Sequence, residues 1–254
     1  RWKKERITAA FHLLATSLDA KIPGTDTFPT PLARQKTVRV IPVLQLDVGL
    51  PGGALLKTSV FEDWNYLRYD DPSLGSLPAT QDRARQVGTE NALLVGDWKF
   101  GFGLRHLYYE TLGFASQFET AFNIQASRTF EWDRFLFEPT VRGVGVTRYG
   151  IHPEANLGVR YVLSEDSAVF ARAGVSRKFP SMLNRFYDYP GSPGFKGFLG
   201  NPELAPERTW TGIVGTETKL AENLRAQLQL FAQYAQEAQV RTALNASNDT
   251  VTNV

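Results

Sequence analysis

The stretch "LRAQLQLFAQY", residues 224–234, has a hydrophobic period of two. Its even positions form one apolar face, made of Leu224, Ala226, Leu228, Leu230, Ala232 and Tyr234. Its odd positions carry Arg225, Gln227, Gln229 and Gln233, with Phe231 as the exception. Because successive side chains of a strand point to opposite faces, this pattern predicts a long strand with one apolar and one polar face.

Similar alternation extends over much of the chain. It recurs clearly in residues 117–127 and 167–178, and less cleanly in 6–16, 37–48 and 155–163. Short turns are expected at 50–53, 95–98, 131–134, 163–167 and 220–224, and long connections near 19–36, 70–82 and 179–206. Alternating short and long connections are typical of outer-membrane barrels. The count is about eleven strands of roughly 10–14 residues, the length that a tilted membrane strand needs, whereas soluble strands average about 5–6 residues.

The composition agrees with a transmembrane barrel but does not require one. The 254 residues are 43% hydrophobic and 12% aromatic, and their mean hydropathy is −0.25. A barrel that alternates lipid-facing and lumen-facing residues keeps its mean hydropathy low. A net charge of +2 gives no sign of a nucleic-acid partner. The absence of cysteine excludes disulfides and thiolate zinc sites.

Aromatic residues gather near the expected strand ends. Phe61, Trp64, Tyr66 and Tyr69 precede a long connection, Tyr108 and Tyr109 end another strand, and Trp98 and Trp132 lie at short turns. Aromatic girdles at the two membrane interfaces would produce this distribution. Large rings that cap the ends of any β core are the alternative explanation.

Two segments flank the longest connection, "GVSRKFPSMLNRFY" at 174–187 and "GNPELAPE" at 200–207. They resemble paired sequences of TonB-dependent outer-membrane receptors. Phe179, Pro180 and Leu183 match the first part, although Phe179 replaces the small residue that usually precedes this proline. Matches to the second part are Gly200, Asn201, Pro202, Leu204, Pro206 and Glu207. The resemblance is clear over about 35 residues and extends weakly, through the alternation, over the whole chain.

The second segment also has a physical interpretation of its own. Pro202 and Pro206 each fix φ and lack an N–H, so the backbone between them should be stiff and extended. Asn201 can close an Asx turn in front of Pro202. Pro206 stands just before the expected strand, where a missing N–H disturbs the ladder little. We therefore expect these prolines to be scaffold rather than ligand contacts.

The resemblance implies a barrel of about 22 strands with a plugged lumen. Members of the family import ferric siderophores, cobalamin, haem or some sugars, using energy supplied through TonB. The chain ends in "NASNDTVTNV", which we interpret as a polar loop, and the strand count is odd. Residues 1–254 are therefore expected to be the middle of one barrel domain, without the plug and the TonB-binding segment.

Candidate ligand contacts lie in the connection 179–199. Aromatic and cationic side chains there could stack on and pair with an anionic or ring-containing ligand. These residues are Arg185, Tyr187, Tyr189, Phe195 and Lys196. Packing of a folded loop against itself would explain the same residues.

Alternation also predicts a charged lumen wall. The residues expected to face the lumen are Arg105, Glu119, Glu138, Arg142, Arg172, Lys178 and Glu217. Contact with a plug would explain these charges without a ligand. Asp70 and Asp71, with Glu62 and Asp63 nearby, could offer oxygen ligands to Ca²⁺. A solvated acidic loop is the alternative for those carboxylates.

Motifs for catalysis are missing from the sequence. The three histidines, His12, His106 and His152, have no zinc-site spacing. "GFGLRH" at 101–106 lacks the third glycine of a dinucleotide loop, and no G-x-S-x-G occurs. A hydrolase site assembled from separate strands is the enzymatic alternative. We expect neither enzymatic activity nor a cofactor.

These observations favour a receptor and transporter of the outer membrane of a Gram-negative bacterium. Its expected partners are the lipid bilayer, a small-molecule or metal-chelate ligand, and the TonB complex, with no nucleic acid. A passive porin-type channel is one alternative. A soluble all-β binding or adhesion protein, such as a propeller, is another.

Overall fold

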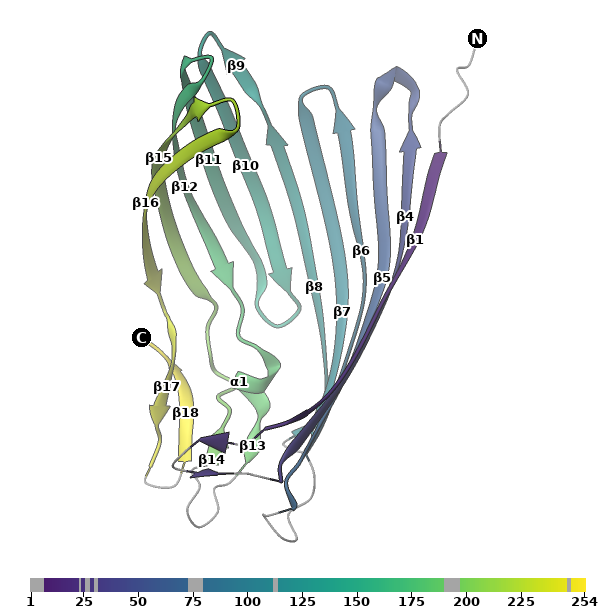
Figure 1. The fold of residues 1–254 in the computed structure, drawn as a ribbon. Coiled ribbons are helices and arrows are strands. Elements are labelled where there is room, and N and C mark those ends of the chain that lie inside the picture. Colours follow the sequence, from purple (N-terminus) through teal and green to yellow (C-terminus); the bar gives the residue numbers. More distant parts are fainter. Residues whose placement is uncertain are drawn as a thin grey trace.

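The computed structural model describes residues 7–22, 24–25, 28–29, 32–72, 80–111, 114–189, 197–245 and 248–254. Most of these residues lie in one curved antiparallel sheet of twelve strands (Figure 1). Its strands, in spatial order, are β1 (Ile7–Lys21), β4 (Arg34–Gly49), β5 (Leu55–Asp70), β6 (Thr80–Val95), β7 (Trp98–Thr111), β8 (Phe114–Arg128), β10 (Phe135–Val146), β11 (Gly150–Ser164), β12 (Ser167–Lys178), β15 (Glu207–Ala221) and β16 (Leu224–Gln236). The short strand β9 (Phe130–Trp132) pairs with β10 beside this path. The prediction of an all-β antiparallel sheet with about eleven long strands is confirmed.

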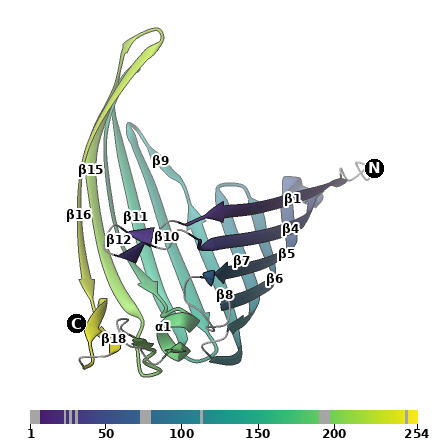
Figure 2. The same cartoon turned by 60° about the horizontal axis from the view of Figure 1, so that its bottom comes forward.

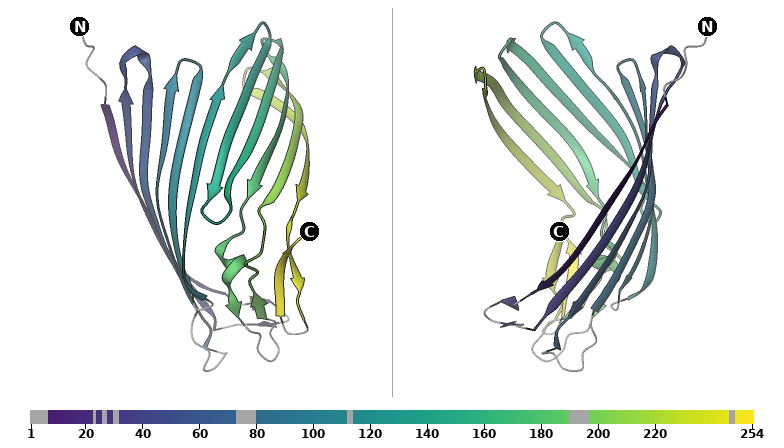
Figure 3. Two further views of the ribbon diagram at one scale, coloured as in Figure 1. Left: turned by 180° about the vertical axis from the view of Figure 1, so that it is seen from behind. Right: turned by 45° about the vertical axis from the view of Figure 1, so that its right-hand side comes forward.

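The two ends of the sheet differ in their connections (Figures 1 and 3). One end, which we call the turn end, carries the tight turns, including the 3₁₀ turn η1 (Pro51–Gly53). Gly52 and Gly96 have positive φ there, a conformation that glycine adopts without steric cost. The other end, the loop end, carries the three long connections. Two short connections also lie at the loop end, Thr111 to Phe114 and the turn 147–149, and neither was predicted from the sequence.

Small elements gather at the loop end (Figure 2). Two of them, β2 (Gly24–Thr25) and β3 (Phe28–Pro29), form a short ribbon. A four-stranded sheet has the order β13 (Asp188–Tyr189), β14 (Gly197–Leu199), β18 (Asn248–Asn253) and β17 (Gln239–Ala243), and α1 (Met182–Phe186) precedes it in the chain. Within the described residues, no helix has the length and apolarity needed to cross a membrane.

The prediction of a polar loop at the end of the chain is wrong, because β18 forms there. This strand pairs antiparallel with β17 and parallel with β14. Its sequence is mostly polar, so its own β propensity gives little signal. Pairing on both sides and the burial of Val251, which is 5% exposed, stabilise it instead.

The strand register gives the large sheet two chemically distinct faces. Val175, Trp210 and Tyr234 lie directly opposite one another across β12, β15 and β16, and Val214 lies opposite Leu230. We call the face that carries them the apolar face. Its side chains remain exposed, with Leu230 at 69% and Tyr234 at 61%. An exposed apolar surface spread over so many strands is typical of a face that contacts lipid or another protein.

Aromatic rings mark both ends of the apolar face. Near the turn end, Trp98 stacks on Phe100 with 5.7 Å between ring centroids. Near the loop end, Trp64 stacks on Tyr66 at 6.4 Å. The expected cluster around Trp64 is divided by the strand, because Phe61 and Tyr69 lie on the opposite, polar face. Aromatic rings therefore lie near both ends of the apolar face, with fewer rings at the loop end of β5 than the sequence alone suggested, and their location at membrane interfaces stays a prediction.

Candidate functional site

The segment 200–207 enters β15 through a compact, buried turn. Asn201 Oδ1 accepts a hydrogen bond from the backbone N–H of Glu203 at 2.9 Å, which closes the expected Asx turn. Leu204 is 1% exposed and Pro206 is buried directly before β15 begins. Burial of these side chains supports the interpretation of the segment as scaffold.

This segment also ties separate parts of the loop end together. The Gly200 N–H donates to Tyr187 O at 2.6 Å, and the Asn201 N–H donates to Asn184 O at 2.8 Å. Arg148 Nη2 donates to Pro202 O at 2.7 Å. Closer to β15, the Ala205 N–H of the same segment donates to Asn253 Oδ1 at 2.8 Å. Residues 200–207 therefore connect the end of α1, the turn 147–149 and β18, and we call them the hub segment.

Arg185, a predicted ligand contact, is buried beneath the loop end. Its Nη2 forms an ion pair with the Glu119 carboxylate of β8, and its side chain is 2% exposed. The guanidinium lies 4.9 Å from the Phe186 ring centroid and 5.6 Å from that of Tyr149. Burial raises the pKa of the Tyr149 phenol. Arg185 thus joins α1 to the wall of the large sheet, and its contact with a ligand stays a prediction.

The other predicted loop contacts are only partly described. The Tyr187 ring is half-buried and lies 6.1 Å from the ring of Phe198. The backbone of Tyr189 belongs to β13. Phe195 and Lys196 lie outside the described residues. For these residues, too, ligand contact stays a prediction.

All seven residues predicted to line the lumen share one face of the sheet, the polar face. The pairings of β7 through β15 place them there, opposite the exposed apolar side chains. The set comprises Arg105, Glu119, Glu138, Arg142, Arg172, Lys178 and Glu217. Whether this face borders a lumen stays a prediction.

Most of these charges have a partner on the same face. Arg105 Nη2 lies 2.7 Å from Glu90 Oε1, and Arg142 Nε lies 3.0 Å from Glu154 Oε2. Lys178 Nζ lies 3.9 Å from Glu207 Oε2. Glu90 and Glu154 were not predicted, although cross-strand pairing of opposite charges indicates them once the register is known.

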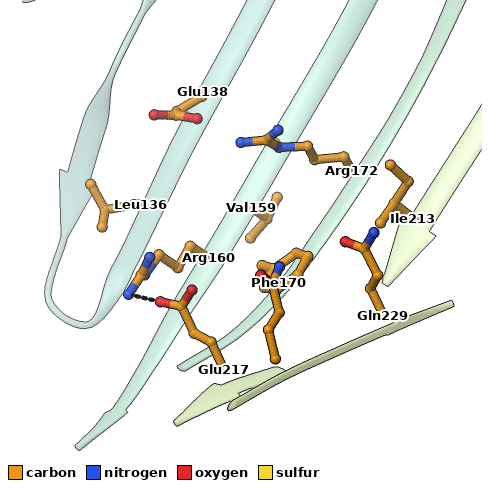
Figure 4. Close-up of a pocket in the computed structure, with 11 residues that line it drawn as sticks. Leu136, Glu138, Val159, Arg160, Phe170, Arg172, Ile213, Glu217 and Gln229 are labelled. Atoms are coloured by element: carbon orange, nitrogen blue, oxygen red, sulfur yellow. Dashed lines mark ion pairs between the residues drawn. The ribbon is translucent and has the colours of Figure 1, made fainter. Parts of the chain in front are cut away.

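Three predicted residues, Glu138, Arg172 and Glu217, meet in one polar cavity of about 370 Å³ (Figure 4). Arg160 forms an ion pair with Glu217 inside it. The remaining lining residues are Leu136, Gly158, Val159, Phe170, Ile213, Gln227 and Gln229. Arg160 and Phe170 were missed in the sequence analysis, because β11 alternates less cleanly and Phe170 interrupts the polar side of β12.

The polar cavity combines one paired and one unpaired cation. Arg160 is held by Glu217, whereas Arg172 has no hydrogen-bond or ion-pair partner among the described residues. Gly158 lies between Glu138 and Arg172 in the register and leaves the space between these side chains open. The cavity can therefore offer a guanidinium to an anionic group, with amides and a carboxylate as further hydrogen-bonding partners.

The acidic residues considered for Ca²⁺ are dispersed. Asp70 Oδ2 lies 3.2 Å from Arg68 Nη2. Glu62 and Asp63 point to opposite faces of β5 and pair with Arg85 and Arg39, respectively. In the part of the chain that the structure describes, no three acidic or histidine side chains are grouped as metal ligands would be. The structure thus brings together no Ca²⁺ site at Asp70 and Asp71 within those residues.

The arrangement of the sheet is similar to that in solved structures of receptors and transporters. The siderophore receptor PirA from Pseudomonas aeruginosa is similar, with a TM-score of 0.68 at 12% identity, over 87% of this chain and 45% of PirA. The FrpB iron transporter from Neisseria meningitidis (F5-1 variant) gives a TM-score of 0.71 at 14% identity, over 98% and 44%. The outer membrane transporter YddB from Escherichia coli gives 0.67 at 14%, over 98% and 41%. The chain thus spans less than half the length of each.

These similarities establish the fold and no more. No protein-family model and no curated protein matches the chain. At 12% to 14% identity the residues of a site cannot be transferred. The shared fold, the open twelve-stranded sheet and the partial coverage are consistent with an incomplete barrel of this type.

Proposed function

We propose that the chain is part of the barrel wall of an outer-membrane receptor that takes up a scarce ligand with energy supplied through TonB. The observation that carries this proposal is the two-faced sheet, whose fold matches siderophore receptors and iron transporters. The apolar face would contact lipid and the polar face would line the lumen. The ligand class we propose comprises ferric siderophores, cobalamin and similar anionic or ring-containing molecules.

In this proposal the polar face has two parts. The loop end, held by the hub segment and Arg185, would present the connection 179–199 to the ligand. The polar cavity, where Arg172 is unpaired, would contact the ligand or a plug deeper in the lumen. Because the proposed chemistry is binding and transport, no catalytic residue is assigned.

The test is uptake by a Gram-negative strain that carries the protein, compared with the same strain lacking it. Radiolabelled ferric catecholate and hydroxamate siderophores and cobalamin would be offered separately, with and without functional TonB. One ligand is expected to accumulate only when both the protein and TonB are present. Uptake that persists without TonB would support the passive channel instead.

A pair of variants tests the polar cavity. Arg172→Gln removes the unpaired guanidinium and is expected to lower uptake severalfold. Arg225→Gln is the matched control, because Arg225 lies on the same face close to the turn end. Equal uptake by both variants and the unaltered protein would remove the cavity from the proposed ligand path.

A further inference from the structure

Two arginines lie on the apolar face where β12 and β15 reach the loop end. Arg177 and Arg208 lie directly opposite each other in the register, one row beyond Val175 and Trp210. The Arg208 guanidinium lies 4.5 Å from the Trp210 ring centroid, which confirms that both side chains occupy the apolar face. Like charges directly opposite each other destabilise a strand pair. An anion between the two guanidinium groups would relieve this repulsion.

Neither guanidinium has a counter-charge within the described part of the chain. The Nε atoms of both Arg177 and Arg208 are buried and lack a hydrogen-bond partner. Glu154 is nearby, but it accepts from the backbone N–H of Arg177 at 2.6 Å and pairs with Arg142. A buried donor left unsatisfied is costly, so an external acceptor would stabilise this pair.

Other arginines on the same face have carboxylate partners. Arg85 Nε lies 2.6 Å from Glu62 Oε1, and Arg83 Nη1 lies 3.7 Å from Glu110 Oε2. These arginines lie near the loop end of β6, at the same end of the sheet as Arg177 and Arg208. The unpaired state of Arg177 and Arg208 is thus specific to their position and is not a general property of this end.

An apolar groove adjoins Arg208, the partner of Arg177 in the register. Its volume is about 790 Å³, and it begins at Arg208 and Val175 and continues past Pro153 and Ile151. Further along, it is lined mainly by apolar side chains of β5 through β10, including Phe100. A ligand with one anionic group and a hydrocarbon chain matches this combination of cations and apolar lining.

We propose that Arg177 and Arg208 bind the phosphate of an anionic lipid, whose acyl chain lies in the adjoining groove. The site depends on the apolar face being lipid-facing, and so it rests on the membrane location in the proposed function. The arginines stand at the edge of the apolar band next to exposed Trp210 and Tyr234, the level at which lipid headgroups lie. Paired guanidinium–phosphate hydrogen bonds supply the specificity, and the groove supplies apolar contact.

The experiment is a titration of the detergent-solubilised protein with phosphatidylglycerol, followed by native mass spectrometry. Arg177→Gln with Arg208→Gln is expected to weaken phosphatidylglycerol binding by at least about tenfold. Arg83→Gln with Arg85→Gln is the matched control, which removes the same charge from the same face and is expected to change binding by less than about twofold. Circular dichroism would verify that each variant is folded. If the double variant fails to fold, the single variant Arg208→Gln would be used in the same titration.

Two results would overturn the lipid site. If both double variants bind phosphatidylglycerol equally well, then Arg177 and Arg208 contribute no more to binding than other arginines on the same face. Inorganic phosphate that displaces phosphatidylglycerol at equal concentration would show a site for free anions. The outcome is separable from the uptake assay: TonB-dependent uptake with unaltered lipid binding in Arg177→Gln/Arg208→Gln would contradict this inference alone.

Discussion

At the residue scale, the ion pair between Arg185 and Glu119 differs from the others on the polar face. Arg185 is 2% exposed, whereas Arg105, paired with Glu90, is 49% exposed. Exposed pairs contribute little, because water screens them and ordering the side chains costs entropy. Removing one partner of a buried pair leaves an uncompensated charge. The two pairs should therefore respond differently to the same substitution.

Glu119→Ala is expected to destabilise the loop end by about 3–5 kcal/mol, because Arg185 would remain charged and buried. Glu90→Ala, the control at the exposed pair, should change stability by about 1 kcal/mol or less. Thermal unfolding in detergent and limited proteolysis of residues 179–206 would measure both effects. Glu119→Leu with Arg185→Met should regain most of the loss. A double variant as unstable as Glu119→Ala would show that the charge pair is not the cause.

Gly200 illustrates a second residue-scale constraint, the close approach of the hub segment to α1. A Cβ at position 200 would lie 2.6 Å from the Arg185 carbonyl carbon and 2.7 Å from the Phe186 nitrogen. Both contacts are with backbone, so neither can be relieved by rotating a side chain. Glycine is therefore required here by space rather than by a left-handed φ.

Gly200→Ala is expected to destabilise the protein by about 1–3 kcal/mol, because α1 must move away from the hub segment. Gly212→Ala is the control, since a Cβ there meets nothing within 4 Å. The melting temperature and the rate of cleavage within residues 179–206 would be compared. Equal behaviour of the two variants would show that α1 adapts without strain.

At the element scale, successive side chains of each long strand point alternately to the apolar face and to the polar face. On β16, Leu230 lies on the apolar face opposite Val214, and Gln229 lies on the polar face opposite Gly215. Substitutions at these two adjacent positions therefore compare the two faces at nearly the same distance from the ends of the sheet. The proposal assigns hydrocarbon to one side and a water-accessible lumen to the other.

Leu230→Arg is expected to destabilise the assembled barrel by about 2–4 kcal/mol, because it places a cation in the middle of the apolar band. Gln229→Arg should be tolerated, because Gln229 is exposed on the polar face and the proposed lumen is polar. The fraction that stays folded in cold detergent gels, and the yield in outer membranes, would measure the difference. Similar yields for both variants would contradict the assignment of faces.

The elements differ in how far sequence could predict them. Long strands such as β16 were predictable, because their apolar and polar residues alternate clearly. This alternation is needed because a shift of the strand register by one residue would move every side chain to the other face. β18 was missed because its stability comes from pairing with β14 and β17 and not from its own composition. The burial of the hub segment supports its interpretation as scaffold, but its bonds to Asn184 and Asn253 depend on tertiary contact and could not be predicted.

The candidate site could be predicted only in part, because the sequence alone does not give the register between neighbouring strands. Alternation placed Glu138, Arg172 and Glu217 on one face, but it could not show that they share a cavity with Arg160 and Phe170. Arg185 was predicted as a ligand contact, with loop packing as the alternative, because composition alone does not distinguish a buried ion-pair partner from an exposed ligand contact. The pairing of neighbouring strands supplies this missing information.

At the scale of the whole molecule, the sheet has few buried apolar residues and many exposed ones. Fully or nearly buried apolar side chains include Ala168, Met182, Leu204 and Val251. A single layer of strands has no second layer to cover its apolar face. Stability in water would therefore require another surface against the apolar face, and in the proposed function lipid is that surface.

The protein is expected to fractionate with outer membranes and to leave them only in detergent. Dilution of the detergent below its micelle-forming concentration should cause aggregation, because the exposed apolar face loses its cover. Sedimentation of membrane fractions and size-exclusion chromatography would test this. A protein that is monodisperse in buffer alone would contradict the membrane location, and with it the uptake and lipid-site proposals.

The hub segment has a consequence for the order of folding. Neighbouring strands of the large sheet are mostly joined by short connections, so their pairing can proceed hairpin by hairpin with little loss of chain entropy. The hub contacts instead join residues 50 positions apart at Asn201 and Val251, and 54 apart at Arg148 and Pro202. The contact between Asn201 and Val251 can form only after the β17–β18 hairpin is in place. The hub contacts with β18 are therefore completed late, and a chain that stops before β18 would have the long strands of this wall without these contacts.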